Sequence, residues 1–400
     1  MSPTRVLLMA LVSCTLASAC TSAKCGTPER ACAIAAADGG TRDGASSDAA
    51  YSGGSGGAGA GGAGEPGSAG SSAGESGSAG AGAQASTDTL QLIGVGSFGL
   101  RARSDDGADW SYCGNARQGD DHTPDLLRAV AYGDGVFVAV GGDQNGRVMR
   151  SLDGEHWEED VHPLDACPDE TYPSSCTNWM GAVAYLSLPR VWLAGGGNGA
   201  TMRSMDGGRT WQGLHKGFPE KHIRSMLAGG GLFMASTDGG DVYVTRDHGD
   251  SWTGGNVWSG AGFLRVLYGF TYFIAYSEAG DACFVSDNLG ASWQPCATEA
   301  QGGTAYLFDG KQWIAAQGDH YATSTNTRDW TKLAAPMPEQ LLFDGTTYFG
   351  RSEGTIYRAT APDAFEVVAT QVPGFRAWTL GRVLNKNLPI TSPAACVDRR

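Results

Sequence analysis

Arginines recur at matched positions of this sequence, and they are the residues best suited to bind an anion. Arg128 and Arg376 each follow an apolar residue and precede Ala, near the start of an apolar segment. Arg224 takes the same position in a third segment, and Arg265 lies one residue away from it in a fourth. A guanidinium donates two parallel hydrogen bonds to a carboxylate. If folding brings these segments together, the arginines could hold a carboxylate group, or they could pair with acidic residues of the protein itself.

Acidic residues occupy loops between the apolar segments. These loops contain Asp143, Asp238, Asp241, Glu278, Asp281, Asp319 and Glu353. At one end of a fold they would form an acidic rim that attracts a basic or cationic ligand. The alternative is that they are ordinary polar loops of an acidic protein, because the net charge is −14. That charge argues against nucleic acid and anionic lipid surfaces as partners.

Other chemistries lack their motifs. The seven histidines show no His-x-x-x-His spacing, and there is no Cys-x-x-Cys pair, so we expect neither a metal site nor a redox centre. The string from Gly94 to Gly99 satisfies Gly-x-Gly-x-x-Gly. A dinucleotide site also needs a helix that begins at the last glycine, whereas here Leu100 to Ser104 leads directly into a polar turn. We therefore expect no cofactor.

A short repeat organises the chain from about residue 90 onward. It reads Ser or Thr, any residue, Asp or Asn, a turn that usually contains Gly, and Trp, and a degraded last copy ends at Phe365. Its acids and tryptophans are Asp106, Asp153, Asp206, Asp247, Trp110, Trp157, Trp211, Trp252, Trp293 and Trp330. Side-chain oxygens accept hydrogen bonds from local backbone N–H groups in such turns, and Gly supplies positive φ. Recurrence in every repeat indicates that these acids hold turns and do not catalyse.

This repeat resembles the Asp box, or BNR repeat, of sialidase-like propellers. A second hairpin precedes most boxes, for example Tyr132-Gly-Asp-Gly-Val-Phe137, so each repeat supplies four antiparallel strands. We expect an all-β fold, a seven-bladed β-propeller over residues 88–400. The first repeat lacks its innermost strand and residues 375–378 match the missing piece, so strands from the two ends of the domain should share one blade. The resemblance implies that the boxes lie on the face away from the ligand.

The resemblance also raises a catalytic alternative, because sialidases hold a carboxylate with convergent arginines. Their Arg-Ile-Pro motif is absent here, and no Tyr/Glu nucleophile pair or general-acid Asp can be placed. The catalytic residues of such an enzyme therefore stay unknown. We expect a non-catalytic binding propeller, with a sialidase-like or other glycan-cleaving hydrolase as the alternative. The candidate ligand-face residues are Arg128, Arg224, Arg376, Asp143, Asp241, Asp281 and Asp319.

The N-terminus is typical of an exported protein. Arg5 precedes an apolar stretch and then small residues. The string from Leu16 to Cys20 resembles the bacterial lipobox, which implies a signal peptide over residues 1–19 and a lipid on Cys20. An ordinary cleavage site near Ala19 is the alternative, with Cys20 free or disulfide-bonded. Residues 20–37 would then be the lipidated N-terminus, and residues 38–87, mostly Gly, Ala and Ser, a flexible tether.

The ten cysteines fit an oxidising compartment. Cys14 leaves with the signal and Cys20 takes the lipid. Two of the remaining pairs are near neighbours that could close small rings, one flanks a hairpin symmetrically, and the last is left by elimination. The expected disulfides are Cys25–Cys32, Cys167–Cys176, Cys283–Cys296 and Cys113–Cys396.

These observations predict a lipoprotein of the bacterial cell envelope. We expect a monomer on the outer membrane, at its periplasmic or its surface face, that touches the membrane through its lipid alone. Its loop-rich face would bind a protein or a glycan, and no nucleic acid.

Overall fold

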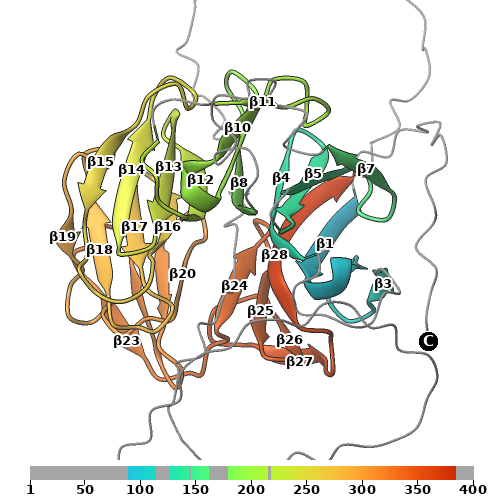
Figure 1. Ribbon diagram of the computed structural model, residues 1–400. Helices are drawn as coiled ribbons and strands as arrows, with labels where there is room; N and C mark the ends of the chain where they lie inside the picture. Colours follow the sequence, from blue (N-terminus) through green and yellow to red (C-terminus); the bar gives the residue numbers. More distant parts are fainter. Residues whose placement is uncertain (1–88, 114–125, 144–145, 162–178, 215–217, 384–400) are drawn as a thin grey trace, which may run out of the picture. The chain divides into compact units, whose positions relative to one another are not determined.

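The computed structural model describes residues 89–113, 126–143, 146–161, 179–214 and 218–383. These residues form seven four-stranded antiparallel sheets arranged as blades in a ring (Figure 1). Apart from strands, the regular elements are two short 3₁₀ turns, η1 (Ser97–Gly99) and η3 (Gly197–Gly199), in the part that is described. The predicted seven-bladed β-propeller is therefore confirmed.

The blades are lettered A to G in chain order. Blade A comprises β28 (Phe375–Val383), β1 (Thr89–Gly96), β2 (Arg101–Ser104) and β3 (Ser111–Cys113). Blade B comprises β4 (Leu127–Gly133), β5 (Val136–Gly141), β6 (Arg147–Ser151) and β7 (Trp157–Val161). Blade C comprises β8 (Met180–Leu186), β9 (Val191–Gly196), β10 (Thr201–Ser204) and β11 (Gln212–Gly213). Blade D comprises β12 (Ile223–Gly229), β13 (Leu232–Thr237), β14 (Asp241–Thr245) and β15 (Thr253–Asn256).

The remaining three blades follow the same order. Blade E comprises β16 (Arg265–Gly269), β17 (Tyr272–Tyr276), β18 (Cys283–Ser286) and β19 (Gln294–Pro295). Blade F comprises β20 (Ala305–Phe308), β21 (Trp313–Ala316), β22 (Tyr321–Ser324) and β23 (Thr331–Leu333). Blade G comprises β24 (Gln340–Phe343), β25 (Tyr348–Ser352), β26 (Thr355–Ala359) and β27 (Glu366–Ala369).

Blade A closes the ring with strands from both ends of the domain. β28 pairs with β1 from Thr89 opposite Val383 to Gly96 opposite Phe375. The innermost strands contact one another in the order β28, β4, β8, β12, β16, β20 and β24, and β24 contacts β28 again. The predicted shared blade is therefore confirmed, and the innermost strands, each an edge of its own sheet, lie against their neighbours around the closed ring.

The core lies between neighbouring blades. The second strands β5, β9, β13 and β21 are buried along their whole length, so buried and exposed residues do not alternate in them. Trp192, Trp313 and Trp378 are fully buried. The outer strands β19 and β23 are exposed at every residue. Each blade is thus stabilised through both faces by its two neighbours.

The repeated boxes form the turns between third and fourth strands. In blade B, the Ser151 hydroxyl accepts a hydrogen bond of 2.8 Å from the Gly154 N–H, and Asp153 Oδ1 accepts two from the backbone N–H groups of Glu155 and His156. The Trp157 indole donates to the Gly154 carbonyl at 3.1 Å. Burial acts to raise the carboxyl pKa in these turns, but the hydrogen bonds outweigh it and lower the pKa of Asp106, Asp153, Asp206 and Asp247.

Equivalent bonds recur in the other intact boxes, so the boxes act as turns. The hydroxyl of Ser104, Ser204, Thr245 or Ser286 accepts from a Gly N–H in the same way. The indoles of Trp110, Trp211 and Trp330 donate to the carbonyls at the start of their turns. Trp252 instead packs edge-on against Phe218, with ring centroids 5.0 Å apart.

An arginine from one blade reaches the box of the next blade, a feature that we call the inter-blade clasp. Its guanidinium donates to the carbonyl of the residue directly before the box Gly. The pairs are Arg150 Nε to Gly207 at 2.8 Å, Arg203 Nη1 to His248 at 3.2 Å, Arg246 Nη2 to Leu289 at 3.1 Å and Arg358 Nη1 to Asp106 at 3.3 Å. Arg103 reaches the box of blade B through Glu155, at 2.6 Å. The clasp therefore joins the blades on the box face of the ring.

Candidate functional site

The predicted ligand-face arginines lie at β-bulges of the innermost strands. The pairing register skips Arg128 between β4 and β5, and it skips Arg224 between β12 and β13. Arg376 is skipped where β28 meets the end of β1. A bulge leaves one residue outside the ladder and re-aims its side chain. One backbone irregularity thus presents three arginines in the same way, on blades A, B and D.

Blade C has the same bulge, but Gly181 occupies it. A Cβ at this position would lie 2.6 Å from the Trp179 ring and 2.5 Å from the Ile223 carbonyl oxygen. The missing side chain therefore makes room for the indole. The Arg128 guanidinium carbon lies 5.0 Å from the Trp179 ring, and that of Arg224 lies 4.7 Å from it. Trp179 holds two neighbouring cations on one aromatic ring.

Two arginines of the innermost strands form ion pairs with acidic residues of the predicted rim. Arg224 binds Asp238 through two hydrogen bonds of 2.8 and 3.1 Å. Arg265, which is 1% exposed, pairs with both oxygens of Glu278 at 3.0 and 3.1 Å. β16 has no bulge, so Arg265 stays in the ladder opposite Tyr276. The missing bulge explains the one-residue offset in the sequence.

The other predicted rim acids do not form one open ring. Asp241 is only 3% exposed and pairs with Lys221, while Asn256 donates to it at 3.1 Å. Burial acts to raise the pKa of Asp241, but these bonds lower it overall. The expectation that Asp241 belongs to an exposed acidic rim is therefore corrected, because its carboxylate is buried in the blade.

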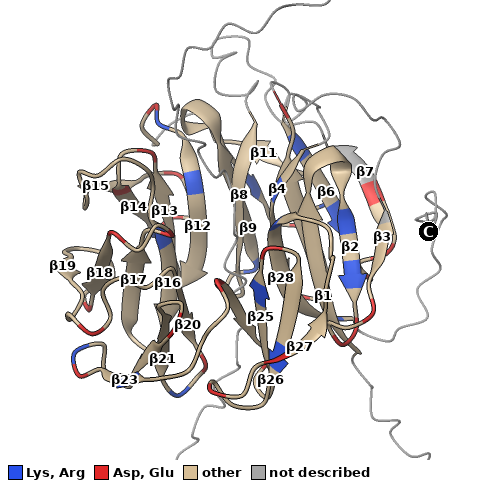
Figure 2. Ribbon diagram, turned by 90° about the horizontal axis from the view of Figure 1, so that it is seen from below, with Lys and Arg blue, Asp and Glu red and all other residues tan. Residues whose placement is uncertain are grey.

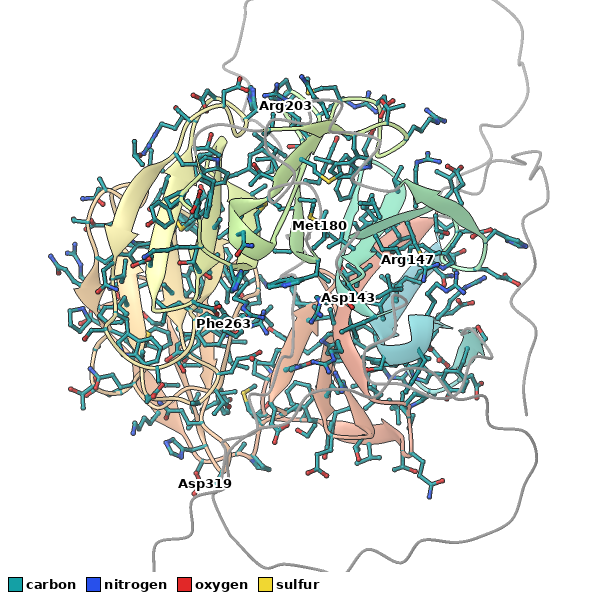
Figure 3. The ribbon with its side chains drawn as sticks, in the orientation of Figure 1. Asp143, Arg147, Met180, Arg203, Phe263 and Asp319 are labelled. Carbon is teal, nitrogen blue, oxygen red and sulfur yellow. A yellow bond between two sulfur atoms is a disulfide. The ribbon has the colours of Figure 1, made fainter. Side chains whose placement is uncertain are left out.

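Asp143, Asp281 and Asp319 are exposed. A hydrogen bond of 2.5 Å from His320 lowers the pKa of Asp319. Figure 3 shows Asp319 at the margin of the ring, whereas Asp143 and Phe263 lie nearer its centre. Asp143 and Asp319 therefore lie in different parts of the ring.

Arg351 and Trp179 are site residues that sequence reasoning missed. Arg351 lies on β25, a second strand, and is 9% exposed. Its guanidinium carbon is 5.1 Å from the Phe375 ring, Nη1 donates to Gln340 at 3.2 Å, and burial lowers its pKa. Figure 2 shows basic positions on β12 and β25 among the strands of the ring. Register matching within first strands could not find Arg351. The only signal for Trp179 was Gly181, two residues later, which stands at the register position where other blades have Arg.

Several predicted residues lie outside the described ranges. These are Cys20, Cys25, Cys32, Cys167, Cys176 and Cys396, and with them the pairings that involve them. A disulfide joins Cys283 to Cys296, with Cα atoms 5.4 Å apart. Within the described ranges, no group of three His, Cys, Asp or Glu side chains could hold a metal ion. The same residues include no helix of the length and apolarity needed to cross a membrane.

No protein-family model matches the sequence. A curated relative is 27% identical over 237 residues, which cover 52% of this chain and 66% of the relative: the photosystem II assembly lipoprotein Ycf48 of a Synechococcus species. The match therefore spans just under two thirds of that protein's length.

Several solved structures align with this chain at low sequence identity. Ycf48 bound to D1 peptide has a TM-score of 0.44 and 17% identity, covering 60% of this chain and 81% of that one. Ycf48 from Cyanidioschyzon merolae has a TM-score of 0.46 and 17% identity, covering 64% and 90%. A GH74 enzyme of Niastella koreensis has a TM-score of 0.44 and 16% identity, covering 67% and 42%.

Proposed function

We propose that this chain is a non-catalytic propeller that binds a protein partner at its bulged arginine face. The observation that carries the proposal is the row of β-bulges on the innermost strands of four consecutive blades, at Arg376, Arg128, Gly181 and Arg224, with the Trp179 ring directly before β8. Bulges are over-represented beside binding and active sites because they re-aim side chains. Four of them in a row at one register position form a prepared surface for a ligand.

The chemistry of this surface suits an acidic segment of a protein. A guanidinium has five N–H donors, so it can keep an internal contact and still receive a carboxylate. Arg128 and Arg224 are fixed by the shared indole of Trp179, which reduces the side-chain entropy lost on binding. An extended acidic chain could contact the arginines of several blades in turn.

Two features favour binding over catalysis. Arg224 and Arg265 are already paired with Asp238 and Glu278, so their charge is balanced by the protein. The sequence relative is named a photosystem II assembly lipoprotein, and that name states no reaction. A glycan remains the second class of ligand to be tested at the same surface.

The N-terminal organisation belongs to the same proposal. Residues 1–19 are the signal peptide, residues 20–37 carry the lipid on Cys20, and residues 38–87 hold the propeller of residues 88–400 away from the membrane. A Gly-rich chain of about 50 residues has a root-mean-square span of roughly 40 Å. The protein would act as a monomer on the bacterial outer membrane, and its lipid would be its only contact with the bilayer.

Peptide titration tests the proposal. The full chain is titrated with a Gly/Glu peptide and with the same peptide carrying Gln in place of Glu. We expect the Glu peptide to bind about tenfold or more tightly than the Gln peptide, and the Arg128→Gln/Arg376→Gln variant to lose that preference. Arg190→Gln, which removes an exposed arginine from the opposite face, is the matched control and should bind like the unmodified protein.

Three results would contradict the proposal. One is equal affinity for the two peptides, and another is an unchanged affinity of the double variant. The third is turnover of a fluorogenic sialoside, since a hydrolase would leave the arginines a catalytic role. Binding of a sialylated or uronic-acid oligosaccharide in place of both peptides would move the ligand to the glycan class.

A further inference from the structure

An exposed phenylalanine lies in a turn of blade A, at the same end of the strands as the bulged arginines. Phe98 is the middle residue of η1, which joins β1 to β2, and its side chain is 40% exposed. Its backbone is left-handed, with φ 58° and ψ 30°. A bulky side chain is strained in this region, and strained residues cluster at functional sites. The strain at Phe98 therefore needs an explanation outside the turn itself.

Blade C shows that this turn does not require a phenylalanine. η3 has the same backbone form, and its left-handed residue is Asn198, with φ 50° and ψ 36°. Asparagine adopts the left-handed region much more readily than phenylalanine. In the other described turns between second and third strands, positive φ falls on glycines or on Glu353. Among the described residues, blade A alone places an apolar side chain at such a position.

The turn lies beside two of the bulged arginines. A Cβ on Gly96, which directly precedes η1, would lie 3.0 Å from the Gly374 carbonyl oxygen and 3.4 Å from the Arg376 backbone nitrogen. η1 therefore begins against the bulge of β28. On its other side η1 contacts β4, the strand that carries Arg128 near its start. An exposed aromatic ring thus accompanies one cationic residue of blade A and one of blade B.

This arrangement suits a protein segment that carries an apolar side chain near its acidic ones. The two arginines can receive carboxylates, whereas the exposed part of the Phe98 ring gains free energy only from an apolar contact. In an extended chain, alternate side chains point to the same side. Acidic, apolar and acidic residues at alternate positions can therefore face the arginines and the ring together.

We infer that Phe98 is a specificity residue of the bulged arginine face and selects acidic segments that carry an apolar side chain. The inference rests on the function proposed above and narrows its partner. The carboxylates of the segment pair with Arg128 and Arg376, and its apolar side chain packs on the Phe98 ring. Contact with the partner accounts for a strained phenylalanine in a turn where blade C has asparagine.

Calorimetric titration of the full chain with two matched peptides tests the inference. Both have the form acetyl-Gly-Glu-Gly-X-Gly-Glu-Gly-amide, with Phe at X in one and Ala in the other. The Phe peptide should bind about three- to tenfold more tightly, which is the gain expected from one aromatic contact. Phe98→Asn, which places the blade C residue in the turn, should bind both peptides with the affinity of the Ala peptide. Phe98→Leu keeps an apolar side chain and should retain part of the preference.

Phe270→Asn is the matched control. Phe270 is also an exposed phenylalanine with positive φ, 60°, but it lies in the turn between β16 and β17, at the opposite end of the strands. This variant should keep the full preference for the Phe peptide. If melting curves show that Phe98→Asn does not fold, p-benzoylphenylalanine at X of the peptide should photo-crosslink to η1 of the unmodified protein. Crosslinking elsewhere would contradict the inference.

The Gln versions of both peptides separate this inference from the proposed function. Equal affinity for the Phe and Ala peptides, with both still bound more tightly than their Gln versions, would overturn the inference alone. No advantage of Glu over Gln in either peptide would overturn both. A preference for Phe that Phe98→Asn retains would also overturn the inference, as would binding of a uronic-acid oligosaccharide that this variant loses.

Discussion

Replacing Arg150 by Met removes one inter-blade clasp while keeping an apolar stem in its place. The Arg150 side chain is 5% exposed, Nε donates to the Gly207 carbonyl at 2.8 Å, and Nη1 pairs with Glu158 at 2.6 Å. A buried hydrogen bond from a charged donor contributes about 1.5–3 kcal/mol. Glu158 is 53% exposed, so it regains water in the variant and its pairing contributes only about 0–1 kcal/mol. We expect the free energy of unfolding to fall by about 2–3 kcal/mol.

Thermal and urea unfolding of the full chain measure this loss. In large domains, each kcal/mol of lost unfolding free energy lowers the melting temperature by about 2–4 °C, and the lower value applies to a domain of this size. We therefore expect the melting temperature to fall by roughly 4–6 °C. Arg190→Met is the control, because Arg190 is 65% exposed in its ion pair with Asp134 and should contribute within about 0.5 kcal/mol. A loss for Arg150→Met no greater than for Arg190→Met would refute the reasoning. A double-mutant cycle with Glu158→Gln should show a coupling below about 1 kcal/mol, since the main partner is the carbonyl of blade C.

Three further predictions follow from the same structure. The pKa of Asp247 is lowered to about 2, because hydrogen bonds from Ser251 and Thr245 outweigh the effect of burial. The ionised Asp247 carboxylate therefore stabilises the folded state fully above the carboxyl pKa in the unfolded chain, about 3.9, and this stabilisation is lost as pH falls towards 2. Asp247→Asn should flatten this part of a plot of unfolding free energy against pH. Truncation before Gly374 should cost much more stability than removal of residues 384–400, because it deletes β28 and the fully buried Trp378; equal melting curves would contradict the closure. Cys20→Ser should release the folded protein from membranes, and a variant that stays with the membrane after a high-salt wash would show that the anchor lies elsewhere.

The repeat made the fold predictable, because six blades contain a polar turn that ends in Trp and the seventh contains a degraded copy that ends at Phe365. The blade count and the sharing of blade A could be predicted from local sequence similarity. Residues 375–378 resemble the start of the innermost strands of other repeats, and they do form an innermost strand, β28. The site was predictable only in part. Arg128, Arg224 and Arg376 share a register position in the sequence, but the bulge that sets it depends on pairing with the second strand.

The misplaced and missed residues have a common physical cause. Asp241 was assigned to an open rim because its loop is polar, yet Lys221, twenty positions earlier in the chain, draws it into the blade. Arg351 and Trp179 contribute through contacts with Phe375, Arg128 and Arg224, which come from other blades. These particular contacts between blades do not recur at a fixed position of the repeat, so only the three-dimensional arrangement reveals them.

The clasp arginines show how one repeat can stabilise both its own turn and the junction with the next blade. Each of these four clasps donates to a backbone carbonyl in the box turn of the neighbouring blade. At the junction of blades E and F, Val285 and Asp287 stand where other blades have the arginine. The turn of blade F nevertheless keeps its own hydrogen bonds, from the N–H groups of Arg328 and Asp329 to Asn326 Oδ1, and the Thr327 hydroxyl donates to the Asn326 carbonyl. The hydrogen bonds within a box are therefore sufficient to hold its turn, and the clasp adds a contact between blades.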